Sequence, residues 1–168
     1  MRTVKKRRRE RKTDYKARMS FLKSPLQRII IRKTNRYIIA QLVLHKEAQD
    51  FTKISLSSKE LLKYGWPKEF NGSLKSIPAC YLIGFLLGKR MLDKGLGNEA
   101  IVDIGLIESI PGNRIYSVIK GVKDAGVIVK CDEEMFPKEE RIKGMHIKKE
   151  LKAVIENILE KMGERKNG

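Results

Sequence analysis

The strongest chemical signal in this sequence is a concentration of positively charged side chains near the amino terminus. Eight of the first twelve residues are Lys or Arg, and one is acidic. Residues 1–36 carry 15 basic and two acidic side chains, a net charge of +13, whereas residues 37–168 carry 22 and 18, a net charge of +4. Guanidinium groups present paired N–H donors that match the oxygens of a phosphate. The chemistry to expect is therefore the binding of a polyanion at one end of the chain.

The basic run over residues 1–12 contains too few apolar residues to fold by itself. We expect an extended arm that orders against the phosphates of a nucleic acid. A solvated tail, a nuclear-localisation signal and a polybasic membrane tether are the alternatives. A tether usually needs a lipid or an amphipathic helix as well, and the sequence shows no lipidation motif.

A second group of cations falls on a predicted β-hairpin. Side chains alternate along a strand, so Arg28 and Arg32 should share one face while Ile29 and Ile31 share the other. The turn between the first two strands, residues 33–36, places two cations in four residues around Asn35, which tolerates turn conformations. Folding alone gives no reason for so basic a hairpin tip.

Catalytic groups are scarce by comparison. Two-metal phosphoryl chemistry needs several carboxylates around ions roughly 4 Å apart, but Asp103 has no partner acid on the first two predicted strands. His45 and His146 lack a Gly-x-Ser-x-Gly or reactive-cysteine context. No glycine-rich phosphate loop follows a strand. We therefore expect no enzymatic activity, no metal site and no cofactor, with a ribonuclease H-like enzyme as the alternative.

The remaining composition fits a single ordinary globular body. The chain has 168 residues and is 41% hydrophobic, enough for a sizeable core. Cys80 and Cys131 are isolated, which favours a reducing, cytosolic compartment. No apolar run approaches the roughly 18 residues of a membrane span, and the amino terminus lacks the apolar segment of a secretory signal.

Hydrophobic periodicity predicts an α/β fold with a mixed sheet. An antiparallel meander of three strands comes first, followed by two helix-strand units and a final amphipathic helix, a ribonuclease H-like layout. The predicted strands are 28–33, 36–44, 51–56, 99–104 and 127–129, and the predicted helices are 13–23, 58–63, 76–94, 114–125, 137–143 and 145–162.

Several local features carry separate expectations. Thr13 should cap the first helix, whose stripe of Tyr15, Met19 and Leu22 faces one way. Gly84 and Gly88, one turn apart, should let a second helix approach closely. The single Trp66 should be buried, with base stacking as the alternative. The final helix should cover either this body or a neighbour.

A series of short motifs also resembles one known family, and several blocks occur in register between residues 12 and 147. They are Lys12-Thr13-Asp14-Tyr15 with Arg18, Arg32-Lys33-Thr34-Asn35, Lys63-Tyr64-Gly65-Trp66, Pro78-Ala79-Cys80-Tyr81-Leu82, Gly84-Phe85-Leu86-Leu87-Gly88-Lys89, Asp103-Ile104-Gly105-Leu106, Pro111-Gly112-Asn113-Arg114, Lys120-Gly121, Asp124-Ala125-Gly126, Phe136-Pro137, Arg141, Gly144 and His146-Ile147. Together they are similar to large-subunit ribosomal protein eighteen of the archaeal and eukaryotic type, the universal 5S-rRNA-binding family.

The resemblance implies the fold called translational machinery components, 5S rRNA as the principal ligand, and a place in the central protuberance with contacts to 23S rRNA and neighbouring large-subunit proteins. The rRNA-binding residues that it implies lie in the arm and the first hairpin. They are Arg7, Arg8, Arg9, Arg11, Lys12, Tyr15, Arg18, Arg28, Arg32, Lys33, Asn35 and Arg36. Tyr15 and Tyr37 could each stack on an unpaired base or pack into the core.

We expect three segments: an arm with a short helix (1–24), an α/β RNA-binding core (25–130) and a C-terminal extension (131–168). The sequence departs from the resemblance at Tyr37, where a histidine is expected, and in the loop 68–75. The helix after His146 lies beyond the matched blocks, so a protein-binding adaptor that uses this helix remains an alternative. The chain length suggests the shorter, archaeal form.

Overall fold

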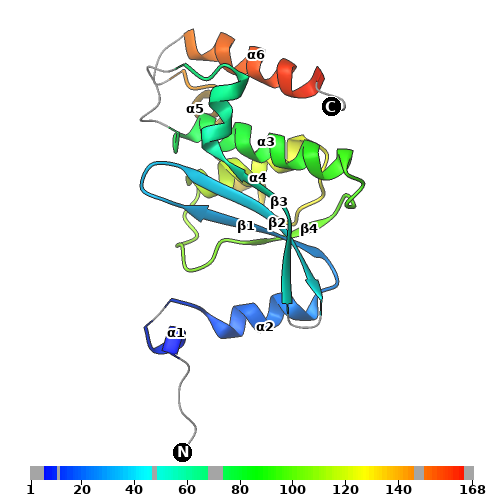
Figure 1. Cartoon of the computed structure of the whole chain (residues 1–168). Helices are drawn as coiled ribbons and strands as arrows, with labels where there is room; N and C mark the ends of the chain where they lie inside the picture. The colour runs from blue at the N-terminus through cyan, green and yellow to red at the C-terminus, as the bar shows by residue number, and fades with distance from the viewer. Residues whose placement is uncertain (1–5, 11, 47–48, 68–73, 146–149, 165–168) are drawn as a thin grey trace, which may run out of the picture.

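The computed structural model describes residues 6–10, 12–46, 49–67, 74–145 and 150–164. A four-stranded sheet lies at the centre, with helices layered on one face (Figure 1). The N-terminal segment, whose described residues are 6–10 and 12–24, lies on the other face (Figure 1). The chain is thus α/β with a mixed sheet, as predicted.

Three antiparallel strands form the meander: β1 (Gln27–Lys33), β2 (Ile38–Lys46) and β3 (Gln49–Ser57). β4 (Ala100–Asp103) pairs in parallel with β1, which gives the order β3-β2-β1-β4. The second strand begins two residues later than predicted, because the Tyr37 N–H donates to Thr34 Oγ1 at 3.0 Å and the Thr34 hydroxyl donates to the Tyr37 carbonyl at 2.6 Å. These bonds close a turn before pairing starts.

Alternation along β1 is as predicted. Ile29 and Ile31 are fully buried in the core beneath the helices, while Arg28 and Arg32 project from the opposite face. The sheet therefore has one apolar face and one face that carries charge, and this second face looks toward the N-terminal segment (Figure 1).

Two long helices cover the apolar face: α3 (Ile77–Asp93) and α4 (Arg114–Asp124). Ser76 caps α3, as expected. A Cβ on Gly84 would lie only 2.1 Å from the Val118 carbonyl oxygen, and one on Gly121 would lie 2.2 Å from that of Tyr81. The glycines thus bring the two backbones into contact, which confirms the packing role predicted for Gly84 and adds Gly121, which the prediction missed.

The chain reaches α3 through the short 3₁₀ helix η1 (Ser58–Tyr64), which Ser57 and Glu60 close with a reciprocal capping box. Trp66 is buried in the core and not displayed for stacking.

Two local predictions were wrong. Residues 127–129 form no strand, only one parallel bridge between Glu99 and Ile128, because three residues beside the short β4 leave little backbone to pair. The helix α2 (Tyr15–Lys23) is capped by Asp14, whose carboxylate accepts from the N–H groups of Lys16 and Ala17, and not by Thr13.

The helix α2 also has no buried residue, and Met19 is 58% exposed, so its predicted stripe packs on nothing substantial. It follows the four-residue helix α1 (Lys6–Arg9), and both lie below the sheet in Figure 1. The N-terminal segment is therefore attached to the body mainly by polar contacts.

The C-terminal part comprises η3 (Glu133–Met135), α5 (Glu139–Ile142) and α6 (Glu150–Glu164). The predicted stripe of α6 is buried against α3 and η1, so this helix folds back on its own body. The buried residues of α6 are Leu151, Ile155, Ile158 and Met162. Ile147, predicted to join this stripe, lies outside the described residues. Within the described segments, every helix is too short or too polar to cross a membrane.

Candidate RNA interface

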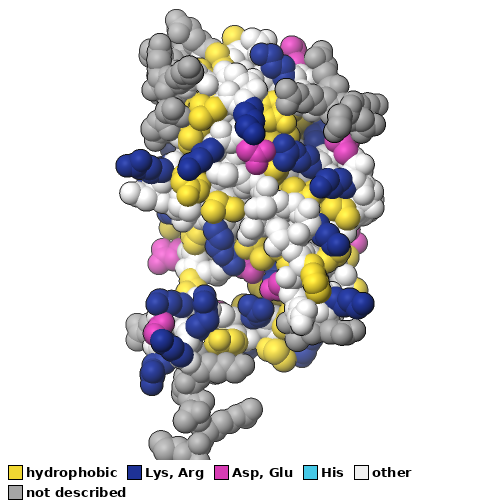
Figure 2. All heavy atoms as spheres, in the orientation of Figure 1, with side chains coloured by type: hydrophobic (Ala, Val, Ile, Leu, Met, Phe, Trp, Pro, Cys, Tyr) yellow, Lys and Arg dark blue, Asp and Glu magenta, His cyan; other side chains and the backbone are white. Residues whose placement is uncertain are grey.

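A groove of about 390 Å³ separates the N-terminal segment from the charged face of the sheet. Figure 2 shows the hollow at this place, with Lys and Arg side chains gathered around it. Its walls come from α1, α2, β1, β3 and the loop after β4. The charged lining residues are Arg7, Lys12, Asp14, Arg18, Arg28, Arg32, Lys33, Asp50 and Asp103. Six cations against three acids leave the groove positively charged.

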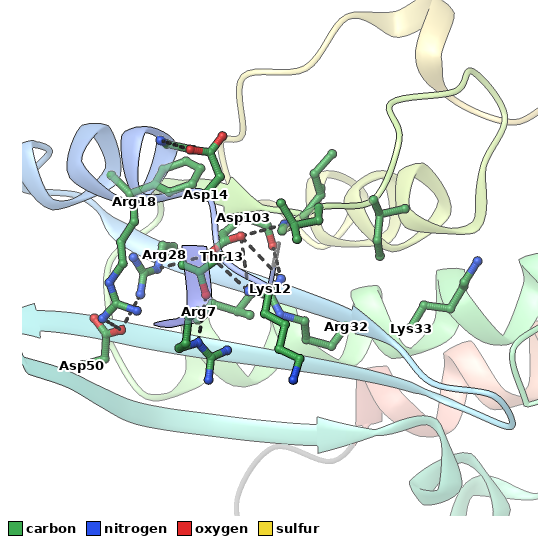
Figure 3. Close-up of a pocket in the computed structure, with 17 residues that line it drawn as sticks. Arg7, Lys12, Thr13, Asp14, Arg18, Arg28, Arg32, Lys33, Asp50 and Asp103 are labelled. Carbon is green, nitrogen blue, oxygen red and sulfur yellow. Dashed lines mark hydrogen bonds and ion pairs between the residues drawn. The ribbon is translucent and has the colours of Figure 1, made fainter. Parts of the chain in front are cut away.

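Arg28 is the buried centre of this charged layer, only 6% exposed. Its Nη2 lies 2.7 Å from Asp50 Oδ2 at the start of β3, and its Nε lies 3.8 Å from Asp103 Oδ2 at the end of β4 (Figure 3). Arg18 of α2 reaches the same Asp50 oxygen at 3.2 Å. A buried charge is stable only when it is paired, so Arg28 joins two sheet edges, and the shared Asp50 attaches α2 to them.

Asp103 is occupied by several donors at once. Its Oδ1 accepts from the Gly105 N–H at 2.8 Å and lies 3.4 Å from the Arg32 guanidinium. Gly105 has φ +69°, and a Cβ there would lie 3.0 Å from Arg32 Nη1. Gly105 therefore permits the turn and leaves room for the arginine, whose side chain stays 44% exposed at the groove edge.

Short-range bonds shape the opposite wall. Asp14 caps α2, the Arg7 Nε donates to Thr13 Oγ1 at 2.9 Å, and Lys12 pairs with Glu10 at 3.0 Å. These exposed contacts are individually weak, and they leave the remaining Arg7 and Lys12 donors available at the rim.

The tip of the β1–β2 hairpin is an exposed cationic surface. Lys33 and Arg36 form no ion pair with any carboxylate in the described segments, and Asn35 is exposed. Lys75 adds a further cation, because its Nζ donates to the Asn35 carbonyl at 2.7 Å. The hairpin therefore presents cations that no internal acid neutralises.

The structure brings six of the residues implied by the resemblance to one groove: Arg7, Lys12, Arg18, Arg28, Arg32 and Lys33. Arg9 is exposed on α1, and Asn35 and Arg36 lie at the hairpin tip. Tyr15 is on α2 but does not line the groove. Arg8 belongs to α1, but its side chain is outside the described set, as is all of Arg11.

Other lining residues were not anticipated. Asp50 gave no signal in the sequence, because its partners are distant in the chain. Phe21 is the one aromatic side chain among the described lining residues, in place of the tyrosines considered. The loop residues Leu106 and Ile107 also line the groove. The sequence did contain a signal for these two residues, because two adjacent apolar residues are unusual in a predicted surface loop.

Tyr37, the other stacking candidate, packs against the core, and Lys59 Nζ lies 4.6 Å from its ring centroid.

The side chains that could support catalysis are paired with other residues or buried. Among the described residues no three His, Cys, Asp or Glu side chains converge as a metal site. Asp103 faces arginines, and His45 Nδ1 lies 3.8 Å from Asp50. Burial raises the pKa of the Cys80 thiol to about 12, which disfavours the nucleophilic thiolate.

Fold and groove together define a basic α/β protein with a cation-lined groove between its N-terminal segment and its sheet. Residues 1–99 match the family of ribosomal large subunit proteins 60S L5 and 50S L18.

Archaeal proteins named large ribosomal subunit protein uL18 are similar over most of the chain. The protein of Korarchaeum cryptofilum is 47% identical over 84% of this chain and 70% of its own length. That of Methanoculleus marisnigri is 47% identical over 84% and 78%. That of Methanothermobacter thermautotrophicus is 39% identical over 93% and 79%.

The chain belongs to this family of large-subunit ribosomal proteins. Membership confirms the resemblance seen in the motifs, including its archaeal type, and the expectation that the chain is not an enzyme.

Proposed function

We propose that this chain is a structural constituent of the large ribosomal subunit that binds 5S rRNA and helps to attach it to 23S rRNA in the central protuberance. Neighbouring large-subunit proteins are its other partners there. Family membership supports the placement in the subunit, and the strand order β3-β2-β1-β4 fits the translational-machinery, ribonuclease H-like layout.

One observation carries the RNA-binding proposal: cations from the arm and from the sheet line the same groove, although more than a dozen residues separate them in the sequence. A-form RNA hides its base edges in a narrow major groove, so proteins grip it by phosphate, 2′-OH and shape. A folded surface with cations on two walls suits that mode of recognition.

The basic residues of the arm and the sheet then have two different roles. Arg7, Arg32, Lys33 and Arg36 retain exposed donors for phosphates. Arg28 is enclosed by two carboxylates, so we assign it the positioning of Asp50 and Asp103 and not a phosphate contact. Arg8, Arg9, Arg11, Lys12, Tyr15, Arg18 and Asn35 complete the proposed RNA-binding set.

The proposed segments remain 1–24, 25–130 and 131–168. The adaptor alternative has little support, because the apolar residues of α6 are buried on α3 and η1 and leave no apolar stripe for a partner. The C-terminal segment acts as part of the body.

Salt dependence tests the mechanism. If arm and hairpin neutralise 6–10 phosphates, the affinity for 5S rRNA falls by roughly 10³–10⁵ between 50 and 200 mM salt. Filter binding of the full chain to 5S rRNA, with transfer RNA as the competitor control, measures this slope. A nearly flat response, or equal affinity for transfer RNA, would contradict the proposal.

A further inference from the structure

Part of the groove lining is apolar, which phosphate binding does not explain. Phe21, Ile30, Ile104, Leu106 and Ile107 line it beside the cations. Leu106 is 57% exposed on a loop where a polar side chain would be expected of a purely electrostatic site. An apolar surface open to water beside positive charge suits a ligand with both a flat apolar part and an anionic part.

The size of the groove limits what that ligand is. A volume of about 390 Å³ is near the lower end of the roughly 300–1,000 Å³ of small-ligand pockets. One nucleotide fits such a space, whereas an RNA duplex does not enter it. Unpaired bases are also the parts of RNA that proteins read by stacking on aromatic side chains.

We propose that the groove holds a single unpaired nucleotide of the bound rRNA, with its base against Phe21 and Leu106 and its phosphate at Arg32 and Lys33. This inference rests on the proposed function, since it names what part of the RNA occupies the site.

The groove is built to receive a base without rearranging its floor. Arg28 Cζ lies 6.0 Å from the centroid of the Phe21 ring, and Arg28 is itself held by Asp50 and Asp103. The ring therefore rests on a buried, paired side chain. Because Asp50 and Asp103 are occupied by arginines, they repel an incoming phosphate less than free carboxylates would.

The loop after β4 closes the site on its other side. Gly105 donates its N–H to Asp103, which fixes the turn and places Leu106 at the groove. Ile110, on the same loop and 53% exposed, does not line the groove. Leu106 and Ile110 therefore allow a matched comparison of one exposed apolar residue inside the site and one outside it.

To test the proposal, the complex of the full chain and 5S rRNA is irradiated at 254 nm, and the nucleotide adducts on the protein are mapped by mass spectrometry. Affinities for 5S rRNA are measured for Leu106→Asp and Phe21→Leu, with Ile110→Asp and Phe85→Leu as controls. Phe85 lies on α3 and, like Phe21, has a cation beside its ring, with Lys89 Nζ at 5.6 Å. Thermal unfolding shows that each variant is folded.

We expect an adduct on Phe21 or on residues 104–107, joined to a nucleotide that is unpaired in 5S rRNA. The groove variants should weaken binding about tenfold, the scale of one lost base-stacking contact, while both controls stay within about twofold.

Tight 5S rRNA binding with adducts only at the hairpin tip, or with full affinity in Leu106→Asp, overturns the nucleotide site and leaves the proposed function standing. Failure of the unmodified chain to prefer 5S rRNA over transfer RNA overturns both.

Discussion

Arg28 Nη2 lies 2.7 Å from Asp50 Oδ2, so a buried guanidinium on β1 is neutralised by a carboxylate at the start of β3. The same Asp50 oxygen receives Arg18 from α2. This pairing links the packing of the sheet to the position of the N-terminal segment.

Asp50→Asn should therefore lower the free energy of unfolding by about 1–3 kcal/mol, because it leaves Arg28 buried with only the longer contact to Asp103. Urea unfolding followed by circular dichroism measures the change. Asp132→Asn removes an acid that is exposed and unpaired within the described structure, and it should change stability by less than about 0.5 kcal/mol. Equal effects would mean that Arg28 is not held by Asp50.

Gly84→Ala should destabilise the protein by about 1–3 kcal/mol or more, since its Cβ would meet the Val118 backbone at 2.1 Å and push α3 from α4. Gly163→Ala is the control, because nothing lies within 4 Å of its added Cβ on α6. Removing a helical glycine there should be neutral or stabilise by up to about 1 kcal/mol. The two unfolding midpoints should move in opposite directions, or only that of Gly84→Ala should fall.

Replacing Lys33 and Arg36 together by Gln should weaken 5S rRNA binding and reduce the magnitude of the salt slope by about 1.4–1.8, because each lost phosphate contact lowers it by about 0.7–0.9. The folded body should keep its stability, since neither side chain pairs with an acid in the described segments. The control replaces Lys152 and Lys161, both on α6, by Gln, which removes the same amount of charge from another part of the protein. If that control lowers the slope equally, binding depends on net charge and not on the hairpin.

Cys80 should resist alkylation in the native protein while Cys131 reacts. Burial raises the pKa of the Cys80 thiol from 9.0 to about 12, whereas Cys131 is only partly buried and its pKa is raised less markedly by desolvation and the nearby Asp132.

A folded-state pKa above the unfolded one means that the stabilising contribution of Cys80 is fully present below pH about 9 and is lost as the pH rises through about 12. Cys80→Ala should flatten the fall in stability over that interval, as measured by urea titration at each pH. Labelling of Cys80 at pH 8 at the rate of Cys131 would contradict its burial.

Local patterns predicted much of the fold. The alternation of Ile29 and Ile31 with Arg28 and Arg32 placed β1 and its two faces, because the pleat forces a period of two. Ser76 and the apolar stripe after it located α3 for equally local reasons. The prediction of a strand over 127–129 was wrong, because a run of three β-branched residues does not show how much neighbouring backbone is available for pairing.

Part of the candidate interface could be read from composition, since the arm and hairpin cations stand in dense local runs. Asp50 and Phe21 could not, because their roles depend on contacts between β1, β3 and α2 that no local spacing records.

The charge asymmetry, the meander and the family motifs could be recognised in the amino-acid sequence, because they depend on residue type and on neighbours within a few positions. Which cations stay exposed, which are neutralised and where α6 packs became clear in the folded protein. Burial and ion pairing depend on distances between residues far apart in the chain, and folding sets those distances.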